Sequence, residues 1–231
     1  MSDLQAMITR IGTEIRRPSL GTSPTAITSP IAKAIFDAIA IYQKDRFRIS
    51  DIDPSVPPSF ATVVGQSVYT LSANANISTI YNIDYLNVYV GSTVGKMTRR
   101  TPEDVLLSIQ QNQQSGQPTD FAYQGNKILI YPVPSAVWTI YIGGHINIAA
   151  PASLAEANNV WMNWAEQLIR CHAKYEIATH ITRNPSMASA MSPDADGGPQ
   201  GKPGETWRAW RRLKNETNRV KSVGRMRAMQ W

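Results

Sequence analysis

Few residues in this sequence have the types and spacing that chemistry requires. The histidines stand at positions 145, 172 and 180, and Cys171 is the only cysteine. On a helix, His172 and His180 would lie roughly 12 Å apart, too far to bind one metal ion without other ligands. Cys171 would point about 100° away from His172, so the two do not form a nucleophile with its base. We therefore expect no metal ion, no cofactor and no catalytic residue.

The short motifs of the common enzyme classes are also absent from the sequence. There is no P-loop, no G-x-G-x-x-G, no H-E-x-x-H and no G-x-S-x-G. Asp51 and Asp53 begin an acidic run that could bind a cation, but Pro54 ends it, so we interpret this segment as a turn. The sequence favours a protein that is not an enzyme.

The positive charge is concentrated in one segment. Of 231 residues, 42% are hydrophobic and 17% are charged, which is typical of a globular protein large enough for one core and a small second unit. Residues 205–231 carry eight basic and two acidic side chains, whereas the other 204 residues carry fifteen of each. A neutral body with one basic end indicates an interaction arm.

A membrane-spanning helix is not expected. Gly143, Gly144 and His145 interrupt the longest apolar stretch, so no run reaches the ~18–20 residues that a membrane helix needs. The N-terminus lacks the basic start and apolar stretch of a signal peptide, so we expect synthesis in the cytoplasm.

Residues 1–50 have the pattern of two helices. Leu4, Ile8, Ile11 and Ile15 form one apolar stripe, and Ser29 with Pro30 begins a second helix that we expect to end near Phe47. Small alanines on the second helix permit close approach of a neighbour. The residues that we expect to form a contact between subunits are Ala34, Ala38 and Ile41.

Residues 51–150 have a β-rich pattern. Phe60–Val64 and Val68–Leu71 flank Gly65-Gln66 and predict a hairpin. In the strand predicted over Ile80–Val90, the alternation slips by one near residue 85, which predicts a bulge. A short helix should follow, capped by Thr101 and packed through Val105, Leu106 and Ile109. We expect about six strands in a small antiparallel sandwich or barrel.

Residues 151–182 predict one long helix that begins with a capping box at Ser153 and Glu156. Helices before and after the β-rich segment predict an α+β fold, in which a helical bundle carries the β domain as an insertion. Residues 183–204 hold four prolines and four glycines and predict an extended linker.

Residues 205–231 predict an amphipathic helix that serves as an arm. Trp and Arg are enriched at interface hot spots, and a helix with tryptophan anchors suits a partner's groove. The residues that we expect to bind a partner are Trp207, Arg208, Trp210, Arg211, Arg212, Leu213, Arg219, Val220, Arg225, Arg227 and Trp231.

Two other interpretations of this arm stay open. The helix could fold back onto its own bundle, with the arginines as a solvated face. It could also bind nucleic acid, because basic side chains neutralise phosphates. Against the second, the tryptophans share the apolar stripe and are not interleaved with the arginines as stacking platforms.

The most specific sequence motif in the chain lies at residues 116–134, GQPTDFAYQGNKILIYPVP. It predicts a hairpin with its turn at Gly125-Asn126 and a second strand that ends at Pro132. This motif, together with Gly65–Leu71 (GQSVYTL) upstream, resembles sequence motifs of the head-to-tail adaptor (connector) proteins of tailed bacteriophages. The order of helices, β-rich middle and long helix is also similar, so the resemblance covers most of residues 1–182.

The resemblance implies a structural virion protein of the neck between capsid and tail, made in the bacterial host cytoplasm. It implies a dodecameric ring, a C-terminal segment that docks to the portal protein, a tail or nozzle protein as a second partner, and non-specific passage of double-stranded DNA. The alternative is a basic-tailed nucleic-acid-binding accessory protein, or another tail or baseplate structural protein.

Overall fold

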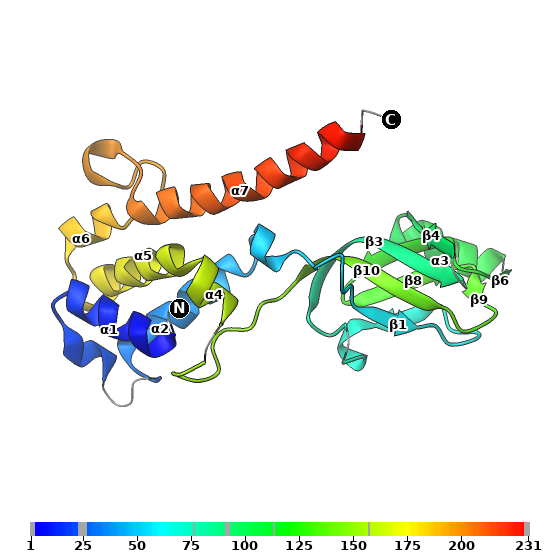
Figure 1. Cartoon of the computed structure of the whole chain (residues 1–231), viewed down its shortest axis with the longest axis horizontal. Coiled ribbons are helices and arrows are strands. Elements are labelled where there is room, and N and C mark those ends of the chain that lie inside the picture. The colour runs from blue at the N-terminus through cyan, green and yellow to red at the C-terminus, as the bar shows by residue number, and fades with distance from the viewer. Residues whose placement is uncertain are drawn as a thin grey trace. The chain divides into compact units, whose positions relative to one another are not determined.

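The computed structural model describes residues 3–22, 27–75, 77–90, 93–112, 114–156 and 158–228, with side chains described as far as Arg219. The fold is mixed α/β, with seven α-helices in the described part (Figure 1). The chain forms two compact units. Residues 1–49 and 148–231 make a helical unit, and residues 50–147 make a β unit.

The helical unit begins with α1 (Leu4–Glu14) and α2 (Pro30–Tyr42). Asp3 caps α1 by accepting from the Ala6 amide, and Ser29 caps α2 by accepting from the Ala32 amide, which satisfies first-turn donors. The apolar stripe predicted for the first helix, formed by Leu4, Ile8, Ile11 and Ile15, is buried. The second helix ends at Tyr42, five residues before the expected end, and Phe47 is buried beyond it.

The predicted helix over residues 151–182 is not continuous. It consists of α4 (Val160–Trp164), α5 (Glu166–Glu176) and one turn of π-helix (Ile177–Ile181). The predicted capping box is wrong, because Glu156 accepts from the Ala152 amide and from the Asn159 side chain. Asn159 is the residue that caps α4.

Residues 183–204 form a compact loop and not an extended linker. They contain α6 (Pro185–Ala190) and a short 3-10 helix (Pro199–Gly201) before α7 (Glu205–Ala228) (Figure 1). Asn184 caps α6, and the Ser189 hydroxyl donates to the Gly197 carbonyl. Ser192 is buried, so this segment, despite its prolines and glycines, packs locally.

The β unit contains two four-stranded sheets in the described residues. The strands of one sheet are, in order, β1 (Ser59–Ala61), β10 (Thr139–Ile146), β3 (Ile80–Val90) and β4 (Thr93–Lys96). Those of the other are β2 (Val68–Thr70), β8 (Lys127–Tyr131), β7 (Asp120–Gln124) and β5 (Thr98–Arg99). A two-stranded pair joins β6 (Ser115–Gly116) to β9 (Val133–Pro134). Two pairs, β5–β7 and β6–β9, are parallel, so the sheets are not wholly antiparallel.

Apolar side chains from both four-stranded sheets share one core. Phe60, Ile83 and Ile142 come from the first sheet, and Phe121 and Ile128 from the second. On the outer face of the second sheet, α3 (Pro102–Gln111) packs through Val105 against Ala122, Leu129 and Tyr131. Thr101 caps α3 as expected, but Leu106 is exposed, because the helix presents Val105 and Ile109 to the sheet.

The hairpin predicted within residues 116–134 is confirmed. β7 and β8 are antiparallel, and Gly125 and Asn126 both have the positive φ that a tight two-residue turn needs. The slip in β3 is also confirmed, since Tyr85 pairs with Gly143 and Ile83 with Gly144, which leaves Asp84 as the extra residue.

The hairpin predicted at residues 60–71 is wrong. β1 pairs with β10 and β2 pairs with β8, so the two strands lie in different sheets. The chain enters and leaves the β unit through adjacent backbone: Asp51 pairs with His145, and the Ile52 amide donates to the Gly144 carbonyl at 2.9 Å.

Candidate interaction surface on the C-terminal helix

One face of α7 packs on the helical unit. Thr206, Ala209, Leu213 and Thr217 are buried, and their steps of three and four residues place them on one side of the helix. α7 runs beside α5 in Figure 1, and the two helices are in contact. Of the predicted apolar stripe, the chain's own unit therefore buries Leu213 and Thr217, whereas Trp207 and Trp210 are half-buried.

Asp45 is the main polar anchor of α7. The indole N–H of Trp210 donates to Asp45 Oδ2 at 2.7 Å, and Lys214 Nζ lies 3.0 Å from Asp45 Oδ1. The Lys214 ammonium also lies 5.0 Å from the centre of the Phe47 ring. Thr217 Oγ1 accepts from the Arg48 amide at 2.9 Å. These contacts fix the first half of α7 to residues 45–48.

The residues expected to bind a partner fall into three groups. Leu213 is buried, and Trp207 and Trp210 are half-buried. Arg208, Arg211, Arg212 and Arg219 are exposed. The side chains of Val220, Arg225 and Arg227, and the whole of Trp231, lie outside the described residues. The described half of α7 packs against the chain's own helices, as the fold-back interpretation expects, and partner binding by its exposed residues stays a prediction.

The exposed face of α7 is rich in arginine. The Arg211 guanidinium lies 4.9 Å from the centre of the Trp207 ring, which holds both groups at the surface. Arg212 lies 3.8 Å from Glu216 and 3.4 Å from the Gln167 amide oxygen. Together, Arg208, Arg211, Arg212 and Arg219 offer planar donors suited to carboxylates or phosphates.

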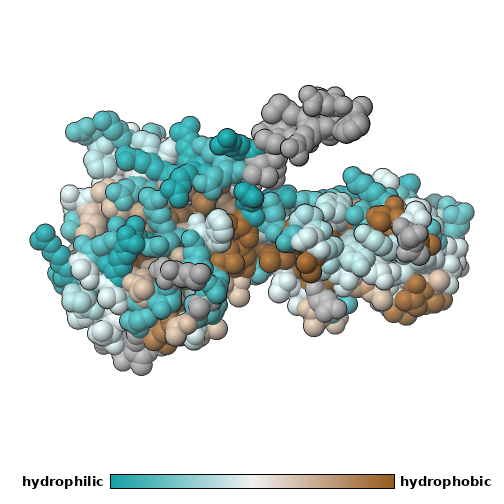
Figure 2. All heavy atoms as spheres, in the orientation of Figure 1, coloured by the Kyte–Doolittle hydropathy of each residue, from teal (hydrophilic) through white to brown (hydrophobic). Residues whose placement is uncertain are grey.

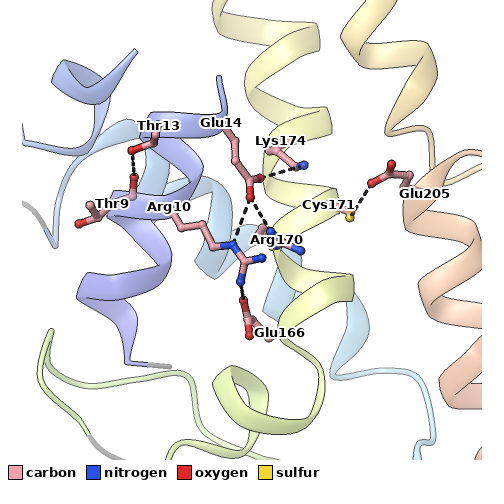
Figure 3. Close-up of polar contacts among 9 residues, drawn as sticks. All are labelled: Thr9, Arg10, Thr13, Glu14, Glu166, Arg170, Cys171, Lys174 and Glu205. Carbon is pink, nitrogen blue, oxygen red and sulfur yellow. Dashed lines mark hydrogen bonds and ion pairs between the residues drawn. The ribbon is translucent and has the colours of Figure 1, made fainter. Parts of the chain in front are cut away.

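An ion cluster holds α1 to α5 (Figure 3). Glu14 is contacted by Arg10, Arg170 and Lys174, and Arg10 also bonds to Glu166 at 2.8 Å. Partial burial alone would raise the pKa of Glu14, but the hydrogen bond and charge of Lys174, with the charge of Arg170, lower the pKa overall. The cluster is a structural contact between helices, since each of its members pairs within it.

Of the candidate reactive groups, Cys171 and His172 are core residues, whereas His180 is exposed. Cys171 is buried, its Sγ lies 3.6 Å from Glu205 Oε2 (Figure 3), and burial raises the pKa of the thiol to about 11. Tyr42 Oη lies 2.9 Å from His172 Nδ1, and His172 Nε2 lies 3.3 Å from Glu176 Oε1. Burial lowers the pKa of His172, against the opposing effect of Glu176. His180 lies 3.3 Å from the second oxygen of Glu176.

Within the described ranges, no group of three or more His, Cys, Asp and Glu side chains could hold a metal ion. Among those same ranges, no helix is both long enough and apolar enough to cross a membrane.

The residues expected to form a subunit contact do not share one accessible face. Ala34 and Ala38 are buried, and α2 packs against α5. Ile41 is exposed. The small alanines thus allow close packing between helices of the same chain, and this packing buries Ala38 completely.

The sequence pattern does not predict the exposure of Trp164. The helix predicted over residues 151–182 is interrupted at Ala165, where φ is −113° and ψ is 14°. Trp161 is consequently in the core, whereas Trp164 is 70% exposed. Trp164 lines a hollow of about 340 Å³ with Phe47, Ile49, Val160 and Leu213. Periodicity gives no signal for a break at an alanine.

No protein-family model matches this chain, and no curated protein is significantly similar to it.

Proposed function

We propose that this protein is a non-enzymatic head-to-tail adaptor of a tailed bacteriophage. It forms a ring, of twelve subunits by resemblance, between the portal and a tail or nozzle protein in the neck of the virion. Double-stranded DNA passes through the ring without sequence-specific recognition. The observation that carries the proposal is the adaptor-like sequence motif at residues 116–134. This segment contains a complete hairpin, in a β unit inserted between helices.

The two sheets of the β unit support the finer fold of the proposal. Their shared apolar core is the arrangement of a small β-sandwich, with α3 as an added outer layer. We propose that this unit, which carries little charge, contacts the tail side.

The geometry of α7 refines the proposed portal contact. Its described packing on the helical unit ends at Thr217, and its backbone continues as helix to Ala228, about 16 Å further at 1.5 Å per residue. We assign portal docking to this second half of α7 together with the exposed arginines. Leu213 and Trp210 position the arm, and Trp164 offers an apolar contact beside Leu213.

A second candidate function is nucleic-acid binding by a basic-tailed accessory protein. The observation that favours it is the arginine-rich face of α7, since its buried side leaves Arg208, Arg211, Arg212 and Arg219 exposed. Phosphate binding should weaken steeply as salt rises, whereas a contact between a helix and a protein groove should persist.

A pull-down from phage-infected lysate distinguishes the two candidate functions. It is done with nuclease added and at about 0.3 M salt, because exposed charges are screened at that concentration. The baits are the full chain and a version ending at Arg219, which keeps the packed half of α7. Retention of the portal by the full chain alone supports the adaptor. DNA binding at low salt, with no virion protein retained by either bait, supports the second candidate and overturns the first.

A further inference from the structure

Trp164 stands largely in solvent on the helical unit. It is 70% exposed, whereas Trp161 on the same short helix α4 is 2% exposed. Trp164 lines a hollow of about 340 Å³, which we call the indole hollow. The other residues that line the indole hollow are Phe47, Arg48, Ile49, Val160, Leu213 and Glu216. A large exposed ring next to an apolar hollow marks an interaction site, whereas scattered exposed apolar residues are normal.

The apolar part of the indole hollow is preformed. Phe47 is 1% exposed and Leu213 is 7% exposed. The Arg48 amide donates to Thr217 Oγ1 at 2.9 Å, and this bond ties the segment that carries Phe47 to α7. The volume is at the lower end of the ~300–1,000 Å³ of ligand sites, so the hollow suits one large apolar side chain. A partner that inserts such a side chain meets a surface already in place, which lowers the ordering cost of binding.

Positive charge accompanies the indole hollow. Arg48 lines the hollow and is exposed. Glu216, the acidic residue of the lining, lies 3.8 Å from Arg212, which balances its charge. The Arg212 guanidinium also donates to the amide oxygen of Gln167, at 3.4 Å, on the helix that follows Trp164. Two arginines therefore accompany one glutamate at this site, so its charge is complementary to carboxylates on a partner.

The positive charge continues along the exposed side of α7. Arg208, Arg211, Arg212 and Arg219 are exposed, and the first and last of them are roughly 16 Å apart along the helix axis at 1.5 Å per residue. Figure 2 shows hydrophilic residues over the described part of α7 and a group of apolar residues below it on the helical unit. Carboxylates spread over this length belong to a polypeptide and not to a small molecule. A phosphate backbone would also pair with arginine, but it brings no apolar side chain for the hollow.

We propose that the indole hollow and the arginines of α7 together bind an acidic segment of a partner protein. One large apolar side chain of that segment fills the hollow against Trp164, and its carboxylates pair with Arg48 and the exposed arginines of α7, whose planar donors suit them. Trp and Arg are the residue types that most often supply the binding energy of such contacts. The identification of the partner as the portal rests on the proposed function, whereas the chemistry of the contact does not.

The contact is tested on the purified full chain with synthetic, fluorescein-labelled peptides of about eight residues, which span the arginines of α7 when extended at ~3.3 Å per residue. The first peptide has a central phenylalanine between glutamates. Serine replaces the phenylalanine in the second peptide, and lysines replace the glutamates in the third. Fluorescence anisotropy at about 0.15 M salt gives the affinities.

The first peptide should bind about tenfold more tightly than the second, because burial of one large apolar side chain is worth at least that factor. The third peptide should bind more weakly still, since its charge is of the wrong sign. Equal affinities of the first and second peptides would show a contact through charge alone and overturn the proposal. Absence of binding by the first peptide overturns it as well.

Substitutions on the protein locate the contact. Trp164→Ala should weaken binding of the first peptide about tenfold and leave the second unchanged, because only the first uses the hollow. Arg48→Glu should weaken the first peptide and strengthen the third, a gain that loss of structure cannot produce. Tyr81→Ala, at an exposed aromatic residue of the β unit, is the control. An effect of Trp164→Ala no larger than that of Tyr81→Ala contradicts the proposal.

A double-stranded DNA oligonucleotide is the competing ligand. Displacement of the first peptide by this DNA, together with weaker DNA binding by Trp164→Ala, would assign the hollow to nucleic acid and overturn the proposal. DNA that binds Trp164→Ala as well as the unaltered chain supports the proposal, because the hollow then serves the peptide alone.

The pull-down separates this inference from the proposed function. Full-length Trp164→Ala should retain less portal than the unaltered chain, and Tyr81→Ala should retain the same amount. Equal retention by Trp164→Ala overturns the indole hollow as the portal contact and leaves the adaptor assignment in place. Failure of the unaltered chain to retain portal overturns the adaptor assignment, while the peptide affinities still decide the chemistry of the hollow.

Discussion

At the residue scale, one carboxylate makes two of the polar contacts that hold α7 in place. Asp45 receives both the Trp210 indole N–H and the Lys214 ammonium, on two different oxygens. The described interface of α7 also contains the buried side chains of Ala209 and Leu213 and the hydrogen bond from the Arg48 amide to Thr217. Asp45 therefore contributes to holding this helix on its unit.

Replacing Asp45 with Ala should lower the free energy of unfolding by about 1–2 kcal/mol, because the substitution removes charge-assisted hydrogen bonds that are only partly shielded from water. Amide hydrogens of α7 should exchange faster, while those of β7 and β8 should not change. Urea unfolding and hydrogen exchange measure both effects. Arg208→Ala, an exposed change on α7, is the control, and equal behaviour of the two variants would show that Asp45 does not anchor the helix.

His172 should make stability depend on pH. Burial lowers the folded-state pKa of His172 below its ordinary value of 6.5, so the unfolded chain takes up a proton first as pH falls. Stability should therefore decrease as pH falls through 6.5, until the folded pKa is reached. The groups facing the ring are Tyr42, Tyr175 and Glu176.

The pH dependence is measured as the midpoint of thermal unfolding between about pH 7 and 5, a range that spans the ordinary histidine pKa. His172→Gln should flatten the curve in this window, whereas His180→Gln, at an exposed histidine, should leave it unchanged. An unchanged slope in His172→Gln would mean that another group carries the dependence.

At the scale of elements, the ion cluster of Glu14 joins α1 to α5. Glu14→Gln would leave Lys174 and Arg170, whose side chains are mostly buried, without their carboxylate. We expect a loss of about 2 kcal/mol in the free energy of unfolding, because an uncompensated buried charge costs more than an exposed one. Arg10→Gln, at the more exposed partner, should cost under about 0.5 kcal/mol. Urea titrations of both variants compare the two values, and equal losses would contradict this account.

The pairing of β3 with β10 depends on Gly144. A Cβ added there would lie 2.1 Å from the Asn82 carbonyl oxygen, which is backbone and cannot move aside. Gly144→Ala should destabilise the β unit by more than about 3 kcal/mol, through displacement of a central strand. Gly116→Ala, where the nearest atom would be 3.9 Å away, should be nearly neutral. Thermal unfolding followed by circular dichroism distinguishes them.

Local signals in the sequence predict local structure well and pairing poorly. Ser29, Thr101 and Gly125-Asn126 act through neighbours a few residues away, so their caps and turn could be predicted. The pattern of Phe60–Leu71 indicates two strands but not their partners, because alternation says which face is buried and not which strand lies beside it. The break before α5 and the fold-back of α7 depend on tertiary contacts such as that of Trp210 with Asp45, which periodicity does not contain.

At the scale of the whole molecule, each of the two units has its own core. The β unit encloses its apolar residues between its two sheets, and Phe121, Ile128 and Ile142 are fully buried there. Residues 50–147, expressed alone, should give a β-type circular dichroism spectrum and one cooperative unfolding transition, since a unit of about 100 residues can fold by itself. A non-cooperative transition, with exposure to apolar dyes, would show that the unit requires the rest of the chain.

The adjacent entry and exit of the β unit, where Asp51 pairs with His145, have a consequence for how such a gene can change. Because the two ends of the insertion lie on neighbouring backbone, its length and content can vary while the separation of its ends stays constant. Recombination at these two points would exchange one β unit for another and leave the helices that frame it intact. We therefore expect related sequences to differ most between residues 51 and 145.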